Sequence, residues 1–306
     1  MSILSAAITL IVLVCVLQVY RYERLRRTSA QDQQVLFHRR DVFHLMIFFR
    51  VRDGDRLVDS VAQFLDLLAE RLSYQLVYCG QAGFFVPSEQ LEEHRWDGLL
   101  VLQLANREDY QQRFAAQMPD LFAGVFADVY MHGMHRNRRF GVSIPLLMLR
   151  MRIVDLLQGR WQAPELKPMM LFKTDPEFEI WRQRVRRLHA IHEVNPSGLV
   201  VYHLVKHDAA QSGLEDDLNK QLLMRMATLG HGPIHIGSTI AVEGNARFDR
   251  VYAVLYPSAN YYAELIGSEF FQWNMYEQPI MDRATLATVP ITEAVSSAFS
   301  REQCAS

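Results

Sequence analysis

Two stretches of this chain, about 152 residues apart, carry the same order of strand, turn and helix signals. The clearer one, residues 230–272, contains a glycine-punctuated strand, a turn, a second strand that begins near Phe248-Asp249, and a helix that follows Pro257. In the weaker one, Trp96-Asp97 takes the place of Phe248-Asp249 and Asn106 opens the helix. Similarity at a fixed offset predicts a duplicated domain.

The first copy is expected to contain a strand, a helix, two strands, a helix and a strand, in that order. Alternating and helical spacing of apolar residues place these elements at 42–51, 57–72, 76–86, 99–104, 106–117 and 121–131. The last segment is predicted as a strand, although its apolar spacing also allows a helix. This βαββαβ order is that of the ferredoxin-like fold.

The second copy is expected to follow the same order. Its strands are predicted at 199–206, 234–242, 248–256 and 275–289, and its first helix at 218–229. The predicted fold class is therefore α+β, with an N-terminal transmembrane helix followed by two tandem ferredoxin-like units.

Several short motifs of the second copy resemble a bacterial family of unknown function in the dimeric α+β barrel superfamily. They are Gly232 with Ile236-Gly237, Val242-Glu243-Gly244, Phe248-Asp249-Arg250, Tyr256-Pro257-Ser258, and the run from Ser268 to Gln272. The superfamily also contains antibiotic-biosynthesis monooxygenases and haem-degrading enzymes. The resemblance implies that two sheets pack bare face to bare face and close a barrel, here within one chain. It brings no established catalytic residues with it.

The N-terminus predicts a membrane anchor. Residues 3–20 carry no charge, and 18 residues just span a bilayer core as a helix. A cleaved signal peptide is disfavoured, because no Lys or Arg precedes the run and no small-x-small site follows it. Arg21, Arg24, Arg26 and Arg27 follow the run and are expected to stay in the cytoplasm. We therefore expect a single-pass inner-membrane protein with the bulk of the chain in the cytoplasm.

The segment 134–161 contains six arginines, among them Arg150 and Arg152, and a single acid. Within it, residues 144–157 form an apolar run that is too short to span a bilayer. One hypothesis is an interfacial helix beside anionic lipid. The other is a linker helix buried between the two copies.

These features divide the chain into six regions. They are an anchor at 1–20, a basic juxtamembrane linker at 21–41, a degenerate first unit at 42–133, an Arg-rich helical linker at 134–197, a second unit at 198–292 and a tail at 293–306.

The residues that could form a ligand pocket are His203, Tyr202 and Tyr256. His203 shares a strand face with Val201 and Val205, so it could act on a ligand if that face lines the barrel. No metal site or cofactor is predicted, because neither the cysteines nor the histidines have a ligand spacing that indicates one. A formal net charge of −2 and the lack of a known motif argue against nucleic-acid binding.

Two functions follow from these observations. The first is a non-catalytic module, held at the membrane, that binds a protein partner or a small apolar ligand. The second is a monooxygenase-like or haem-handling enzyme that acts on a lipophilic substrate. A closed core packed with side chains would favour the first, and an open pocket that His203 or Tyr202 faces would favour the second.

Overall fold

The structure is a computed structural model of the whole chain. It describes residues 3–30, 43–71, 73–86, 96–136, 138–159, 167, 176–194, 198–207, 232–241, 248–269 and 280–295. The helix expected at 218–229 lies outside these residues, as do the side chains of Arg26 and Arg27.

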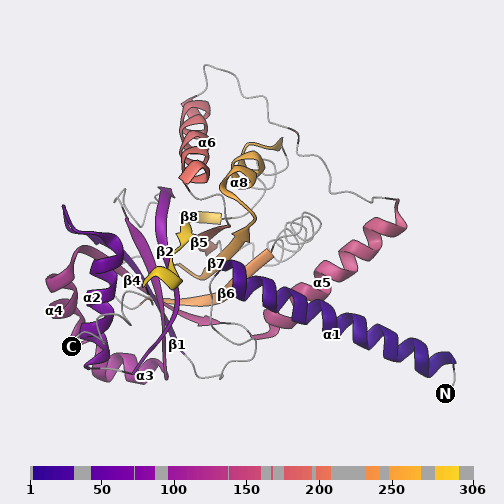
Figure 1. Cartoon of the computed structure of the whole chain (residues 1–306), viewed down its shortest axis with the longest axis horizontal. Coiled ribbons are helices and arrows are strands. Elements are labelled where there is room, and N and C mark those ends of the chain that lie inside the picture. Colours follow the sequence, from indigo (N-terminus) through magenta and orange to yellow (C-terminus); the bar gives the residue numbers. More distant parts are fainter. Residues whose placement is uncertain are drawn as a thin grey trace.

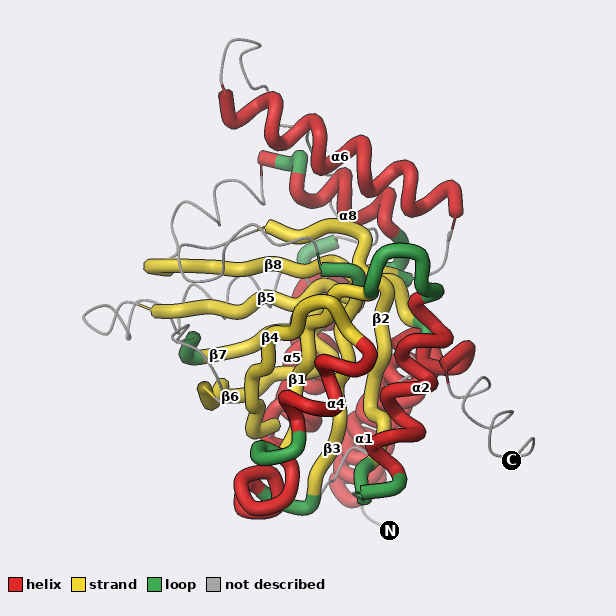
Figure 2. The backbone as a smooth tube through the Cα atoms, turned by 90° about the vertical axis from the view of Figure 1, so that its left-hand side faces the viewer, coloured by secondary structure: helices red, strands yellow, loops and turns green. Residues whose placement is uncertain are grey.

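Eight antiparallel strands form a closed barrel (Figure 2). The strands are β1 (Phe43–Val51), β2 (Gln75–Val86), β3 (Gly98–Leu104), β4 (Phe126–Arg136), β5 (Leu199–His207), β6 (Gly232–Ala241), β7 (Arg250–Tyr256) and β8 (Ile280–Pro290). Their order around the barrel is β1-β3-β2-β8-β5-β7-β6-β4. Each half therefore has its fourth strand, first, third and second side by side, which is the ferredoxin-like order.

Helices cover the outside of both halves (Figure 1). The helices α2 (Leu57–Ala69), α3 (Arg107–Asp109) and α4 (Met118–Val125), with the π-helical turn η1 (Tyr110–Phe114), belong to the first half. The second half carries α6 (Pro176–Val194) and α8 (Ala259–Ile266). The helices α1 (Ile3–Ala30) and α5 (Arg138–Leu157) contact each other and extend away from the barrel. The predicted α+β class with an N-terminal apolar helix is confirmed.

The interior of the barrel is filled by side chains from both halves. Phe48 and Met46 of β1 pack there with Tyr78 of β2 and Tyr202 of β5, and none of these four exposes more than 1% of its surface. Two further apolar clusters lie between the sheet and the helices, one in each half. The strands β1 and β3 are thus buried on both faces over nearly their whole length, as two packed layers around a closed sheet require.

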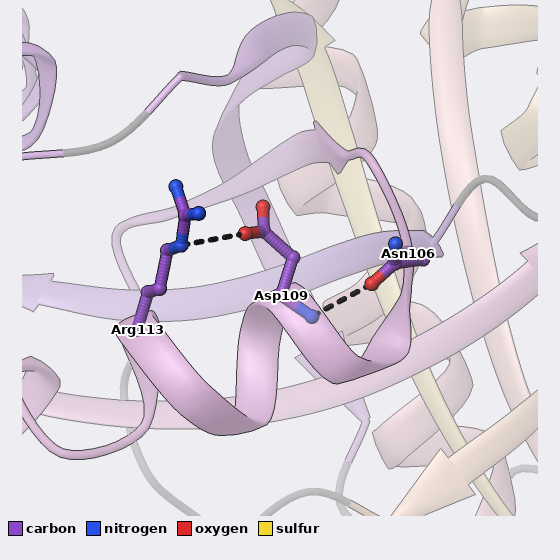
Figure 3. Close-up of polar contacts among 3 residues, drawn as sticks. All are labelled: Asn106, Asp109 and Arg113. Atoms are coloured by element: carbon purple, nitrogen blue, oxygen red, sulfur yellow. Dashed lines mark hydrogen bonds and ion pairs between the residues drawn. The ribbon is translucent and has the colours of Figure 1, made fainter.

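The two halves of the barrel make equivalent backbone hydrogen bonds before their third strands. The N–H of Asp97 donates to the carbonyl of Phe49 at 2.9 Å, and the N–H of Asp249 donates to the carbonyl of Val205 at 2.8 Å. The following helix is capped in both halves by a side-chain oxygen. In the first half Asn106 Oδ1 accepts from the N–H of Asp109 at 2.7 Å (Figure 3), and in the second Ser258 plays this part.

The strand predicted at 121–131 is wrong in its first half. The chain forms the helix α4 up to Val125, and β4 begins only at Phe126. Leu121, Phe122 and Val125 lie on one face of α4, and Phe122 stacks on Phe64 of α2 at 5.2 Å. Apolar residues at helical spacing therefore decide this boundary.

The helix α5 is not buried between the two halves, so that hypothesis is wrong. It packs on α1, where Met148 contacts Tyr22. Further along, Ile153 and Leu157 are 48% and 82% exposed.

The helix expected at 106–117 is interrupted, because a π-helical turn follows its first three residues.

A glycine at the seam between the halves is expected to be intolerant of substitution. A Cβ on Gly80 would lie 2.6 Å from Tyr78 Oη and 2.7 Å from Thr288 Cβ. These two side chains share a buried hydrogen bond of 2.8 Å across the seam between β2 and β8. We expect Gly80→Ala to lower the free energy of unfolding by about 1–3 kcal/mol through overpacking, measured by denaturant titration.

Gly124 in α4 is the matched control, because a Cβ there meets nothing within 4 Å. Gly124→Ala should stabilise the protein by about 0.4–1 kcal/mol, since alanine restricts the unfolded chain. Equal effects of the two substitutions would contradict the tight seam at Gly80.

Candidate polar site on the outer face of the second half

Four polar side chains lie together on the helix-facing side of the second half, and we call this set the His203 face. It consists of His203 on β5, Tyr252 on β7, and Arg283 and Thr285 on β8. His203 is paired in register with Tyr252 on one side and with Thr285 on the other. Arg283 lies two residues before Thr285 in β8, so it points to the same face, and it is paired in register with Val205.

The equivalent positions of the first half hold only apolar residues. There Ile47 of β1 takes the place of His203, and it is paired in register with Leu100 and Met131. Ile47, Leu100 and Met131 all belong to the buried cluster under α2 and α4. The two halves thus share a strand order, but one has a polar outer face where the other has an apolar core.

His203 is half-buried and fixed by a hydrogen bond. Its Nδ1 lies 3.0 Å from the hydroxyl oxygen of Thr285. Burial, with the charge of Arg283 as a second cause, lowers the pKa of His203 to about 3. The imidazole is therefore neutral at physiological pH, and it can hold or relay a proton only when its surroundings change.

The two arginines of this region bring positive charge to the face. Burial lowers the pKa of Arg283 to about 10, and Tyr262, Tyr252 and Tyr256 oppose the shift, so its guanidinium stays charged at neutral pH. The second arginine, Arg250, lies on β7, on the other side of β5, and its Nη1 donates to the hydroxyl of Tyr252 at 3.4 Å. The arrangement is rich in donors, which suits a ligand with a carbonyl, phenolate or carboxylate oxygen.

The anchor helix reaches this face. Tyr22, near the end of α1 that lies at the barrel, is 8% exposed and packs against Met148 of α5 and Tyr252 of the His203 face. The contact places the His203 face beside the helix that is expected to enter the bilayer. A lipophilic molecule would therefore have a short path from lipid to the site.

The structure separates the three residues predicted to line a pocket. His203 and Tyr256 lie on the outer face, whereas Tyr202 points into the filled barrel, 5.6 Å from Tyr78 between ring centroids. The face of β5 that carries His203 therefore does not line the barrel, which was the condition set for a role of His203 inside it. Tyr256 packs on Tyr262 of α8 at 4.5 Å between ring centroids, and it pairs with Leu199, four positions along β5 from His203.

Sequence reasoning missed Tyr252, Arg283 and Thr285. A signal was available, because the aligned strands of the first half carry Leu100, Val129 and Met131 in their places. A polar residue in one copy opposite an apolar residue in the other marks a position that packing alone does not determine.

The predicted membrane-proximal arginines lie on α1 and α5. Arg21 and Arg24 are exposed near the barrel end of α1, and Arg150 and Arg152 are exposed on α5. One helix of the described part of the chain is long and apolar enough to cross a membrane. It covers the 22 residues Ile3–Arg24. Residues 3–21 are not buried, whereas Tyr22 and Glu23 at its barrel end are.

A haem does not fit the interior of the barrel. Tyr78 and Tyr202 fill it, and a single added Cβ at Gly80 already meets Tyr78. Within the described residues, no group of three His, Cys, Asp or Glu side chains is arranged to hold a metal ion.

The sequence matches no protein-family model and no curated protein. Three of the similar solved structures are named as enzymes. A proposed monooxygenase from Lactobacillus acidophilus has 9% identity, covers 82% of this chain and 94% of its own, and gives a TM-score of 0.40. A mutant chlorite dismutase from Candidatus Nitrospira defluvii has 10% identity, covers 86% of this chain and 98% of its own, and gives a TM-score of 0.41. A proposed dyp-type peroxidase from Shewanella oneidensis has 8% identity, covers 88% of this chain and 98% of its own, and gives a TM-score of 0.42. At these values the likeness assigns no reaction to this chain.

Proposed function

We propose that this chain is a membrane-anchored α+β barrel enzyme that acts on a lipophilic molecule with an acidic hydrogen at the His203 face. The observation that carries the proposal is the polar set His203, Tyr252, Arg283 and Thr285 at positions that are apolar in the first half. Polar groups under a helix layer cost stability unless they are paired. Their presence in one half alone indicates a role other than packing, and this favours an enzyme over a purely structural module.

The chemistry available at this face is the stabilisation of an anion beside a neutral imidazole. Arg283 favours the negative charge that develops when a substrate loses a proton. Its charge also contributes to the low pKa of His203. A bound anion counteracts that charge, so binding raises the pKa of His203 towards the range in which proton transfer is efficient.

Oxidation of anthrone by O2 tests this proposal. Anthrone is lipophilic, its central methylene carries acidic hydrogens, and one molecule with one O2 gives anthraquinone and water. We expect the full chain in lipid nanodiscs to accelerate anthraquinone formation, followed by absorbance, above the rate with empty nanodiscs. His203→Phe and Arg283→Gln should each lower the rate at least about tenfold, since each removes a positioned polar group.

Arg113→Gln is the matched control for these variants. Arg113 is 70% exposed, lies in the first half and pairs with Asp109 there, so its loss should leave the rate unchanged. Binding of anthrone without oxidation would contradict the enzyme and favour the non-catalytic module. If the His203→Phe variant oxidised anthrone as fast as the unaltered chain, the His203 face would not be the site of the reaction.

We further propose that α5 contacts the membrane through its last two turns. Ile153 and Leu157 are exposed there, with Arg150 and Arg152 exposed beside them. A helix with an apolar side and arginines fits the surface of anionic lipid. A spin label on Leu157→Cys should therefore be more accessible to oxygen than to a water-soluble nickel reagent.

The control label is Ala190→Cys on α6, an exposed helix position away from α1 and α5 (Figure 1). The background carries Cys15→Ser and Cys304→Ser, whereas burial raises the pKa of the Cys79 thiol and keeps it unreactive. If the label at 157 were as accessible to the nickel reagent as the label at 190, α5 would not touch lipid.

The same strand order, the equivalent Asp97 and Asp249 contacts and the equivalent caps support a common origin of the two halves. We propose that they are tandem copies of one ferredoxin-like unit that pair within the chain. In this view the first half keeps the apolar face and the second carries the site.

A further inference from the structure

A pocket of about 840 Å³ lies where α6 crosses β2. This volume is within the range of roughly 300–1,000 Å³ that is usual for small-molecule sites. Its walls come from the end of β1, the turn between β1 and α2, the second part of β2, residues 96–97 and α6. None of its lining residues belongs to the His203 face.

A bulge in β2 builds the floor of this pocket. The pairing of β2 with β8 shifts register between Ala82 and Phe84. Gly83 at the bulge lies directly under Ile191 of α6, where a Cβ would collide. The two phenylalanines after Gly83 lie on opposite sides of the sheet. Phe84 stacks on Tyr262 of α8 at 6.3 Å between ring centroids, whereas Phe85 packs with the cluster inside the barrel. Both rings line the pocket, together with the buried Trp96.

Six charged residues line the pocket, three of each sign. They are Arg50, Arg52, Arg187, Asp53, Asp55 and Asp97. Two of them have structural roles. Asp97 Oδ2 accepts from the N–H of Val51 at 2.9 Å, and the guanidinium of Arg52 donates to the carbonyl of Ala123.

Arg50 and Arg187 differ from these two. In the part of the chain that the structure describes, the side chain of neither makes an ion pair or a hydrogen bond. Arg50 comes from β1 and Arg187 from α6, so two unpaired guanidinium groups reach the pocket from different walls. A guanidinium binds a carboxylate in bidentate fashion and also stacks on aromatic rings. The exposed Asp53 and Asp55 disfavour a ligand with several negative charges.

We propose that this pocket binds an aromatic acid with a single negative charge. Its ring lies on the floor formed by Trp96 and Phe85, and its carboxylate binds Arg50 and Arg187. The pocket is distinct from the His203 face, so the proposal does not depend on the anthrone reaction.

Titration calorimetry with 2-naphthoate on the full chain in lipid nanodiscs tests the proposal, with empty nanodiscs subtracted. Arg50→Gln and Arg187→Gln should each weaken binding by about tenfold, the loss expected for one charge-assisted contact. Arg186→Gln is the matched control. Arg186 is the exposed neighbour of Arg187 on α6 but does not line the pocket, so its substitution should leave the affinity unchanged.

Two further probes test the ligand class on the unaltered chain. The neutral 2-naphthalenemethanol should bind about tenfold more weakly than 2-naphthoate, because it lacks the carboxylate. ADP should bind more weakly than 2-naphthoate, because its several charges face Asp53 and Asp55. Equal affinity for the acid and the alcohol, tighter binding of ADP, or equal effects of the Arg186 and Arg187 substitutions would each overturn the proposal.

Discussion

Replacing Trp96 or Phe248 by alanine is expected to lower the free energy of unfolding by about 3–5 kcal/mol. Both residues precede a strand and point into the barrel, where Trp96 is 4% and Phe248 5% exposed. The Trp96 ring meets Phe48 edge-on at 6.1 Å, and the Phe248 ring meets His132 at 6.0 Å. Because the interior is filled from all sides, neighbouring side chains cannot collapse into the space that either ring leaves.

Denaturant titration in nanodiscs, followed by far-ultraviolet circular dichroism, measures this effect. Arg113→Ala serves as the control, because the Arg113 side chain is 70% exposed and its ion pair with Asp109 should contribute less than about 1 kcal/mol. A midpoint for Trp96→Ala or Phe248→Ala that equals that of the control would show that the ring is not a core residue.

Deleting residues 1–20 is expected to convert an integral membrane protein into one that alkaline carbonate releases from membranes. The 22-residue stretch Ile3–Arg24 is about 33 Å long as a helix, enough to cross the hydrocarbon core. This deletion keeps Tyr22, which packs on Tyr252, so the barrel should remain folded. A deletion to residue 30 also removes Tyr22 and should lower the melting temperature.

The expected orientation has a separate test. With Arg21 and Arg24 on the barrel side of the span, the barrel should stay in the cytoplasm. Alkaline phosphatase fused to the C-terminus should then be inactive in a bacterial host, and green fluorescent protein at the same place should fluoresce. An active phosphatase fusion would reverse the topology. Full-length protein that carbonate releases would show that α1 is not a span.

The sequence predicted the strands better than their surroundings, and the reason is physical. In β1 and β5 the alternating positions are apolar on both faces, because one face meets the barrel interior and the other meets helices. The alternation therefore shows a strand but does not show which face points inward. For this reason the sequence offers both His203 and Tyr202 as pocket residues, although the two lie on opposite sides of the sheet.

The site was less accessible to prediction than the fold. His203 stood out because a histidine interrupts an apolar strand, but Arg283 and Thr285 lie in a final strand of mixed composition. Their significance comes from register, which brings β8 beside β5 and sets Thr285 against His203. Such pairings between distant segments are not specified by local patterns. The α4 boundary failed for a related reason, because a short apolar run suits either element.

Closure of the barrel also fixes an order of events during synthesis. The strand β2 is complete at Val86, but its partner β8 begins only at Ile280. Thr288, which shares a hydrogen bond with Tyr78, is made 210 residues after it. At roughly 5–20 residues per second, the ribosome needs on the order of 10–40 s to make the intervening chain. One edge of β4 has no partner until β6 is made, and one edge of β2 has none until β8 is made. An open edge is a template for pairing with another nascent chain. The emergence of β6 and β8 thus ends a period of exposure to misassembly, and slow translation over 208–279 would lengthen it.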